Sequence, residues 1–203
     1  MIKFFLNLFK AYGFNLFLVI TYEIKYILSR YKGNYINILN NESFTDNIPV
    51  PYLFLEKIYF FIKKKKIKNI IDLGCGSGRF IYFMQKKIPG IKLYGLEINK
   101  EIFQKTKRIF FKNNNIFIIN NNILNETNIF KKRFFDIYYL NDPLKKKKDY
   151  NNLFKDIFNS SKKKSYIITV NINKKNMNSK KLKLIYNYNV KKKNLKIFQI
   201  NKK

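Results

Sequence analysis

The chain contains no histidine and no tryptophan, and its 203 residues include one cysteine, Cys75. A single cysteine excludes an internal disulfide framework, and without histidine the usual zinc sites cannot be assembled. Catalytic pairs of serine or cysteine with histidine are excluded for the same reason. Any chemistry must therefore use carboxylates, amides, tyrosines, lysines or a cofactor, and we predict no metal site.

Acidic residues are scarce, with 12 Asp and Glu against 42 Lys and Arg, so the formal net charge is +30. A chain with this charge attracts anionic surfaces, whether nucleic acid or lipid. The lysine excess also fits heavy use of A/T-rich codons, since Ala11 is the only alanine in the chain. The lysine runs are scattered between predicted elements, which favours solvated loops over a nucleic-acid site. They are residues 63–66, 145–148, 162–164 and 191–193.

The composition excludes a disordered chain, because hydrophobic residues make up 46% of it and aromatic residues 18%. The length fits one ordinary domain with an extension. We predict an N-terminal helical extension and connector over residues 1–50 and a single domain over residues 51–203.

The N-terminal segment is apolar apart from a narrow polar stripe. Lys3, Asn7 and Lys10 fall at helical spacing, which predicts an amphipathic helix over residues 1–20. Its largely apolar stretch, residues 11–20, is shorter than the ~20 residues of a spanning helix. No small-residue cleavage site follows, as a signal peptide would require. The helix either packs on the domain or a partner, which we favour, or lies in a membrane interface beside its flanking lysines.

From residue 51 onward, strand and helix patterns alternate. The predicted strands are residues 67–73, 91–96, 116–119, 134–140, 166–170, 182–188 and 195–200. The predicted helices cover residues 51–62 and 78–88, a segment capped by Asn99, and a segment around residues 153–158. This alternation predicts an α/β fold with a doubly wound, mostly parallel, seven-stranded sheet of Rossmann-like type. The last two strands are predicted to form an antiparallel hairpin at one sheet edge.

A glycine-rich motif lies where the first predicted strand turns into a helix. Residues 70–79 read Ile-Ile-Asp-Leu-Gly-Cys-Gly-Ser-Gly-Arg. Glycine permits a tight turn and close approach of a ligand to the backbone. The free N–H groups and positive dipole end of the helix suit an anionic group. Because Arg79 interrupts the G-x-G-x-x-G spacing, an ordinary dinucleotide site is disfavoured.

An acidic residue, Glu97, ends the second predicted strand, nineteen residues after Gly78. A carboxylate at this position can accept hydrogen bonds from both hydroxyls of an adenosine ribose. Together the two motifs resemble those of the class I S-adenosylmethionine-dependent methyltransferases, whose first motif is typically an E/D-x-G-x-G-x-G run. The resemblance covers roughly residues 51–200 and implies a Rossmann-like methyltransferase domain.

The resemblance implies S-adenosyl-L-methionine as the cofactor and assigns a set of residues to it. The glycine loop with its aspartate matches the cradle for the methionine and ribose portions, with the cysteine as a small spacer. Glu97 matches the ribose-binding acid, Ile98 matches a residue packed on the adenine, and Asn122 falls where the family commonly has an acid for the adenine amino group. The complete set is Asp72, Gly74, Cys75, Gly76, Gly78, Glu97, Ile98 and Asn122.

The fourth predicted strand ends beside the position that the resemblance gives to the transferred methyl group, since ligands of open α/β sheets bind at the carboxyl ends of strands. We predict Asn141 and Asp142 as catalytic residues that contact the acceptor, with Asp142 as the base if a proton must leave. Tyr138 or Tyr139 would position the acceptor. The run resembles the N/D-P-P-Y/F motif of amino-methylating enzymes, but Leu144 replaces its second proline, which disfavours DNA adenine methylation.

The sequence thus predicts a methyltransferase that moves a methyl group from S-adenosyl-L-methionine to an unidentified small molecule or protein by direct displacement. Two alternatives stay open: a protein-lysine methyltransferase of the non-SET type, and a catalytically silent subunit that binds the cofactor. We expect a cytoplasmic protein. Peripheral membrane contact through residues 1–20 is an alternative, and nucleic acid is not favoured as a partner.

Overall fold

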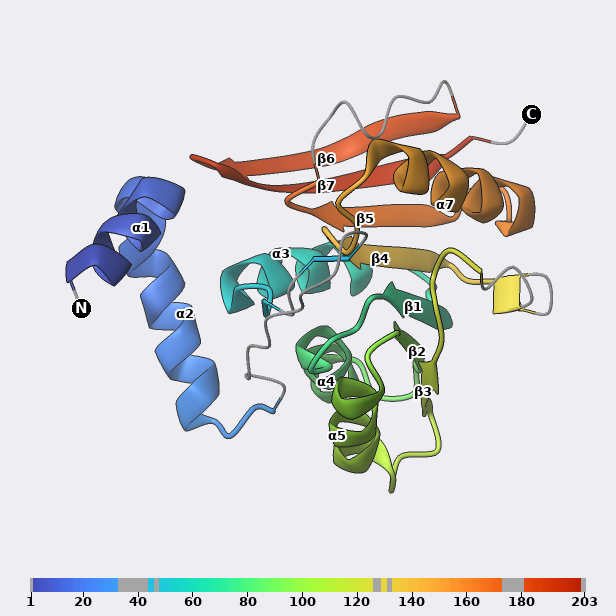
Figure 1. The fold of residues 1–203 in the computed structure, drawn as a ribbon, viewed down its shortest axis with the longest axis horizontal. Helices are drawn as coiled ribbons and strands as arrows, with labels where there is room; N and C mark the ends of the chain where they lie inside the picture. The colour runs from blue at the N-terminus through green and yellow to red at the C-terminus, as the bar shows by residue number, and fades with distance from the viewer. Residues whose placement is uncertain are drawn as a thin grey trace.

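The structure, a computed structural model, describes residues 2–32, 44–45, 48–125, 129–130, 133–172 and 181–201. Its centre is a seven-stranded sheet with the order β3-β2-β1-β4-β5-β7-β6 (Figure 1). The strands are β1 (Asn69–Leu73), β2 (Lys92–Glu97), β3 (Ile116–Asn120), β4 (Ile137–Asn141), β5 (Tyr166–Val170), β6 (Leu182–Val190) and β7 (Lys193–Ile200). The pairs among β1 to β5 are parallel, while β7 pairs antiparallel with both β5 and β6. The predicted fold class and the edge hairpin are confirmed.

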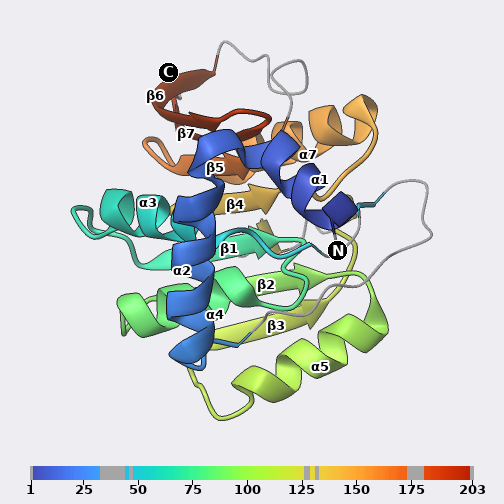
Figure 2. The same ribbon diagram turned by 90° about the vertical axis from the view of Figure 1, so that its left-hand side faces the viewer.

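Helices cover both faces of the sheet. They are α3 (Tyr52–Ile62), α4 (Arg79–Lys87), α5 (Lys100–Phe110) and α7 (Lys147–Ser160). Figure 2 shows α3, α4 and α5 in front of the sheet and α7 behind it. Alternate residues of β4 belong to the two hydrophobic clusters that result: Ile137 and Tyr139 to the one beneath α3 and α4, Tyr138 and Leu140 to the one beneath α7. The core therefore has two layers, as a sheet buried on both faces requires.

The predicted elements match closely, with differences at their ends. Asn99 caps α5 as predicted, because its side-chain oxygen accepts a hydrogen bond from Ile102 N at 3.0 Å. The fourth strand starts at Ile137 and not at residue 134, since the carboxylate of Asp136 accepts backbone hydrogen bonds from Lys68 and Asn69 just before the ladder begins. α7 is longer than the segment predicted around residues 153–158.

The N-terminal segment forms two helices, α1 (Ile2–Tyr12) and α2 (Leu16–Leu28), separated by a 3-10 turn over Gly13–Asn15. The single helix predicted over residues 1–20 is therefore interrupted. Gly13 has φ +58°, a backbone conformation that glycine adopts without strain. In the part of the chain that the structure describes, no helix combines the length and the apolar character needed to cross a membrane.

The helix α2 packs on the domain through one side. Leu16, Val19 and Tyr26 are buried there, and the Tyr26 ring stacks on that of Tyr52 with 4.6 Å between centroids. These residues belong to the same hydrophobic cluster as α3 and α4. The predicted division of the chain at residue 50 stays a prediction. Buried residues on both sides of this position belong to one hydrophobic cluster. Most of the predicted connector, residues 33–43 and 46–47, lies outside the described residues.

Candidate active site

A cavity opens at the carboxyl ends of β1, β2 and β4. The empty space in and above it is about 690 Å³ when the open solvent at its mouth is included. Its walls come from the glycine loop, from the ends of β2 and β4, and from residues 44–45 and 48–50. The lining residues are Phe44, Thr45, Ile48, Pro49, Val50, Asp72, Gly74, Cys75, Gly76, Ser77, Arg79, Phe80, Glu97, Ile98, Ile123, Tyr139, Asn141 and Pro143.

The glycine loop, residues 74–78, is hydrogen-bonded to β2 and closely packed against α5. The N–H groups of Gly74 and Cys75 both donate to the Leu96 carbonyl, at 3.0 and 2.8 Å. Gly78 has φ +75°, and a Cβ there would lie 2.8 Å from the Phe110 ring. A side chain at this position would thus meet both backbone strain and a packed neighbour. The loop conformation depends on glycine, and it leaves the backbone exposed toward the cavity.

Glu97 is anchored at the edge of the cavity by two backbone donors. Its two carboxylate oxygens accept hydrogen bonds from Gly76 N at 2.9 Å and Asn99 N at 2.8 Å. Burial raises the pKa of this carboxyl, and the backbone hydrogen bonds act in the opposite direction. Each oxygen retains a lone pair, so the carboxylate can still accept hydrogen bonds from a ligand.

Asp72 is buried at the end of β1 and lines the same cavity. Its carboxylate has no hydrogen-bond partner among the residues that the structure describes. Burial, together with the nearby charge of Glu97, raises the pKa of Asp72 well above its ordinary value. An unpaired buried carboxylate is unfavourable in the free protein. It is therefore a group that a cationic ligand in the cavity would stabilise.

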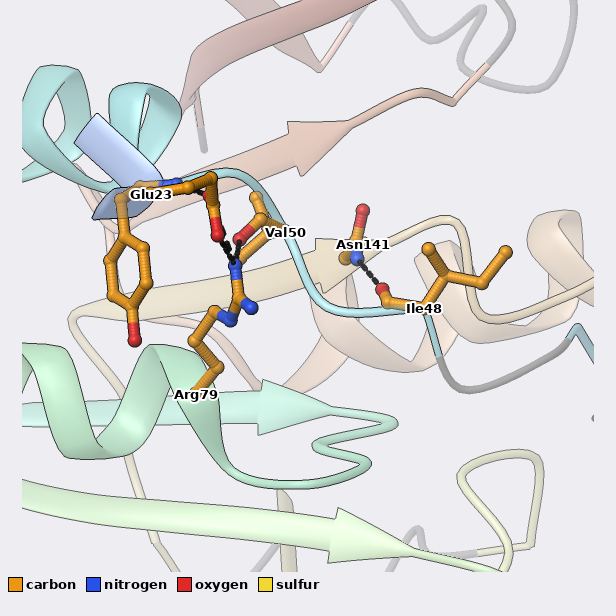
Figure 3. A network of polar contacts seen from close by, with 6 residues as sticks. Glu23, Ile48, Val50, Arg79 and Asn141 are labelled. Carbon is orange, nitrogen blue, oxygen red and sulfur yellow. Dashed lines mark hydrogen bonds and ion pairs between the residues drawn. The ribbon is translucent and has the colours of Figure 1, made fainter. Parts of the chain in front are cut away.

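Arg79, the first residue of α4, connects the cavity to the N-terminal helices. Its Nη1 donates to both carboxylate oxygens of Glu23 on α2, at 2.9 and 3.1 Å, and to the Val50 carbonyl at 3.0 Å (Figure 3). The guanidinium also lies over the Tyr52 ring, 4.5 Å from its centroid. Glu23 accepts a further hydrogen bond from Tyr52 N at 2.8 Å. One ion pair thus fixes α2, the start of α3 and the start of α4.

The side chain of Asn141 makes a second contact that holds residues 48–50 in place. Its side-chain amide donates to the Ile48 carbonyl at 3.0 Å, as Figure 3 shows. Ile48 and Val50 are therefore held by two side chains from different elements, Asn141 at the end of β4 and Arg79 at the start of α4. The short segment of residues 48–50 forms one wall of the cavity, and we call it the cover.

The two predicted tyrosines lie on opposite faces of the sheet. Tyr139 lines the cavity and stacks on Phe80, with 3.8 Å between ring centroids. Burial and the nearby Asp72 raise the pKa of Tyr139 well above 10, so its hydroxyl is a donor, and it has no partner among the described residues. Tyr138 belongs to the hydrophobic cluster beneath α7.

Asp142 is adjacent to Asn141 but is directed elsewhere. Its carboxylate accepts a hydrogen bond from the Tyr150 hydroxyl on α7 at 2.7 Å, and its backbone carbonyl accepts one from the Thr45 hydroxyl. Asp142 is not among the described residues that line the cavity. The structure thus brings one of the two predicted catalytic residues to the cavity and places the other against α7.

The predicted cofactor residues line the cavity with two exceptions, Gly78 and Asn122, which are not among the described lining residues. Gly78 lies behind the loop against Phe110, and the side-chain oxygen of Asn122 accepts a hydrogen bond from Leu124 N at 2.8 Å. The apolar wall on this side is made by Ile98 and Ile123 instead. Burial raises the pKa of the Cys75 thiol well above its ordinary value, and a protonated thiol is a weak nucleophile.

Sequence reasoning missed the residues that close the site from the N-terminal side. Glu23 and the segment of residues 48–50 were assigned to an extension and a connector, and Arg79 only to a departure from a glycine pattern. One signal could have identified the ion pair: Glu23 is the only acidic residue among residues 2–32, and it lies in a largely apolar helix. A single acidic residue in a helix that packs on a domain is expected to pair with a basic side chain.

Comparisons with known proteins bear on the family and the fold. A family model described as a methyltransferase domain matches residues 64–202. No curated protein matches the chain. The RNA methyltransferase from Salinibacter ruber in complex with S-adenosyl-L-homocysteine superposes with a TM-score of 0.60 and 12% identity, over 77% of this chain and 95% of that chain. The N-methyltransferase NodS from Bradyrhizobium japonicum WM9, in complex with the same molecule, gives a TM-score of 0.59 and 10% identity, over 74% and 87%. Likeness at such identities shows the fold.

Proposed function

Because the chain belongs to the family of the methyltransferase domain, we propose that it binds S-adenosyl-L-methionine in this cavity and transfers the methyl group to an acceptor near the end of β4. The observation that carries the proposal is the pair of buried carboxylates, Asp72 and Glu97, at the carboxyl ends of adjacent strands. Asp72 has no hydrogen-bond partner among the described residues. Glu97 is anchored by two backbone N–H groups, and its oxygens keep lone pairs for a ligand.

The residues present fit the cofactor part by part. Glu97 is suited to the ribose hydroxyls, since two backbone N–H groups fix its orientation. Ile98 and Ile123 offer apolar contact for the adenine. Asn122 accepts one hydrogen bond from Leu124 N, and it keeps its amide N–H groups and one lone pair of its oxygen for a ligand. Asp72 is suited to the methionine ammonium group, whose charge would favour the ionised carboxylate.

The bound cofactor supplies an electrophilic methyl group on a sulfonium, whose departure leaves a neutral thioether. The protein then has mainly to align the acceptor and exclude water. Tyr139 and Asn141 line the cavity at the end of β4, where a phenol donor and an amide can orient an acceptor. The cover of residues 48–50 and the apolar Phe44 and Phe80 limit access of water.

Asp142 fits a supporting role better than that of a direct base. Its carboxylate accepts from Tyr150, and its backbone carbonyl accepts from Thr45, so it fixes the loop after β4 to both α7 and the N-terminal connector. Through this loop it would position Asn141. If the methyl acceptor must lose a proton, a group other than Asp142 would then take that proton.

The first test is calorimetric titration of S-adenosyl-L-methionine into the wild type, Glu97→Ala and Glu101→Ala. Glu101 is a matched control because it is an exposed glutamate on α5 outside the cavity. We expect the Glu97 variant to bind at least ~10-fold more weakly, since a hydrogen bond to a charged group contributes ~1.5–3 kcal/mol. Equal binding by both variants would remove the ribose assignment, and no binding by the wild type would contradict the proposal.

The second test identifies the acceptor class. Radiolabelled cofactor is incubated with the protein and cell extract, and the labelled products are separated by size before and after protease digestion. Label in a protein would favour the lysine methyltransferase alternative, and label in a small molecule would exclude it. Cofactor binding without label transfer across a broad acceptor panel would favour the silent subunit.

Two further expectations stay predictions: that the protein is cytoplasmic, and that nucleic acid is not its favoured partner.

A further inference from the structure

The outer side of α1 and α2 is apolar and exposed. Phe14, Phe17 and Leu28 have 87%, 73% and 76% of their surface exposed. Isolated exposed apolar side chains are ordinary, but a group on one pair of neighbouring helices marks an interaction site. We call this group the α1–α2 surface, and its members are Leu6, Phe9, Phe14, Phe17, Leu18, Ile24, Ile27 and Leu28.

This surface is separate from the packing of α2 on the domain. The inner side of α2 is already buried through Leu16, Val19 and Tyr26. Phe17, Ile24 and Leu28 follow at i, i+7 and i+11, which places them on another face of the same helix. Figure 2 shows α2 crossing in front of α3 and α4, so the side away from those helices faces outward.

The described charged side chains beside the α1–α2 surface are cationic. Lys10, Lys25 and Arg30 are exposed beside it. The β6–β7 hairpin adds cations at the other end, since Lys191 Nζ lies 5.4 Å from the Phe9 ring centroid. The only acid in residues 2–32, Glu23, is turned inward to Arg79. An exposed apolar face bordered by cations, without an acidic group, is typical of a helix that lies in the interface of an anionic membrane.

We propose that the α1–α2 surface binds the interface of a membrane that contains anionic lipids. A second copy of this chain fits the surface poorly, because a symmetric contact would bring the lysines and arginine of both copies together without acids to pair them. The inference does not depend on the methyltransferase activity, since it rests on the exposed side chains and charges of α1, α2 and the hairpin.

The absence of tryptophan makes a direct experiment available. Phe17→Trp places a single fluorescent reporter in the α1–α2 surface, and Phe111→Trp places one at the end of α5. The two phenylalanines are matched, since each has 73% of its surface exposed. Each variant is titrated with vesicles of phosphatidylcholine alone and of phosphatidylcholine with phosphatidylserine, at low and high salt.

We expect the emission of the Phe17→Trp variant to shift to the blue with the phosphatidylserine vesicles, and more at low salt than at high salt. The Phe111→Trp emission should stay at its water-exposed wavelength. A shift at both positions, or at neither, would overturn the proposal, because a chain of charge +30 also adsorbs without inserting any particular face. An equal shift at position 17 with both kinds of vesicle would remove the role of the anionic lipid.

A co-sedimentation experiment separates apolar insertion from simple charge attraction. We expect the double variant Phe17→Ser with Leu28→Ser to partition onto phosphatidylserine vesicles ~10-fold or more weakly than the wild type. The matched variant Phe111→Ser with Phe134→Ser changes exposed phenylalanines elsewhere and should partition as the wild type does. Equal partition of the two double variants contradicts the proposal. Sedimentation velocity without vesicles tests the second copy, and self-association that the Phe17 and Leu28 changes abolish would overturn the membrane assignment in its favour.

Discussion

The two sides of the cavity are built in different ways. The proposed cofactor side consists of the glycine loop and the ends of β1 and β2, and its key contacts are made by backbone N–H groups within residues 72–99. The proposed acceptor side consists of the end of β4 with the cover of residues 48–50, and side chains that are distant in the sequence hold it in place. Backbone contacts within one βαβ unit form wherever that unit forms, whereas the acceptor side needs three separate elements to be in place at once. The shape of the first side should accordingly depend on its glycines and backbone contacts, whereas the shape of the second should depend on side-chain contacts between elements far apart in the sequence.

The largest effect is expected where a side chain is forced into the cofactor side. Gly78→Ala combines positive φ with a Cβ at 2.8 Å from the Phe110 ring, so we expect a loss of ~3 kcal/mol in the free energy of unfolding. Gly90→Ala is the control, since Gly90 has φ +92° but open space around a Cβ. Urea titration should show the smaller loss for Gly90. Equal losses would mean that backbone strain alone, and not packing of the loop, accounts for the effect.

The second effect concerns the ion pair that closes the acceptor side. Glu23→Gln leaves the guanidinium of Arg79 buried with a neutral partner, and we expect a loss of ~1–3 kcal/mol in the free energy of unfolding. The exposed pair of Glu101 with Lys105 supplies the contrast, because Glu101→Gln should change stability very little. A neutral result for Glu23→Gln would mean that α2 is held by apolar packing alone.

The third change has opposite effects on stability and on binding. The raised pKa of Asp72 means that the folded state favours its protonated form, so ionisation at higher pH reduces stability. Asp72→Asn should therefore raise the free energy of unfolding by ~1–2 kcal/mol at neutral pH, and the gain should vanish below the ordinary carboxyl pKa of about 3.9. Thermal unfolding across pH measures it, and a loss of stability at neutral pH would contradict the assignment.

The same variant also tests cofactor binding. A ligand with an ammonium group requires the ionised carboxylate, so wild-type affinity should rise with pH through the raised pKa of Asp72, with release of a proton. Calorimetry in buffers of different ionisation enthalpy detects that proton. Asp72→Asn should bind more weakly and without this pH dependence. A wild-type affinity that does not change with pH would place the ammonium group elsewhere.

The smallest effect on stability, ~1 kcal/mol, is expected for Asn141→Ala, which removes one hydrogen bond to Ile48. Turnover should fall by ~10-fold or more with unchanged cofactor affinity, because Asn141 lies at the end of β4, whereas we assign the ribose of the cofactor to Glu97 on β2. Asn187→Ala, at an exposed position on β6, is the control. Loss of cofactor affinity together with turnover would show that the cover serves the cofactor side as well.

The fold and the cofactor side could be predicted from the sequence because both depend on local patterns. Alternating apolar segments specify the strands, and the glycines with Glu97 stand in order along one βαβ unit. The acceptor side could not be predicted in the same way. Asn141 and Asp142 are neighbours with similar chemistry, and only the position of Tyr150 on α7 determines that Asp142 turns toward that helix. Glu23 meets Arg79 across 56 residues of sequence, and no local pattern encodes such a contact.

The docking of α2 on α4 has a consequence for the newly made chain. The inner side of α2 meets Phe83 and Arg79, which lie on α4 and are synthesised after α1 and α2 are complete. At ~5–20 residues per second, the roughly fifty-five residues from Lys32 to Lys87 take about 3–10 s to be added. During that interval the inner side of α2 lacks these α4 partners, and its outer side is as exposed as it is in the folded protein. A factor that shields apolar segments near the ribosome, or early contact with a lipid surface, would therefore act on these helices before the rest of the domain exists.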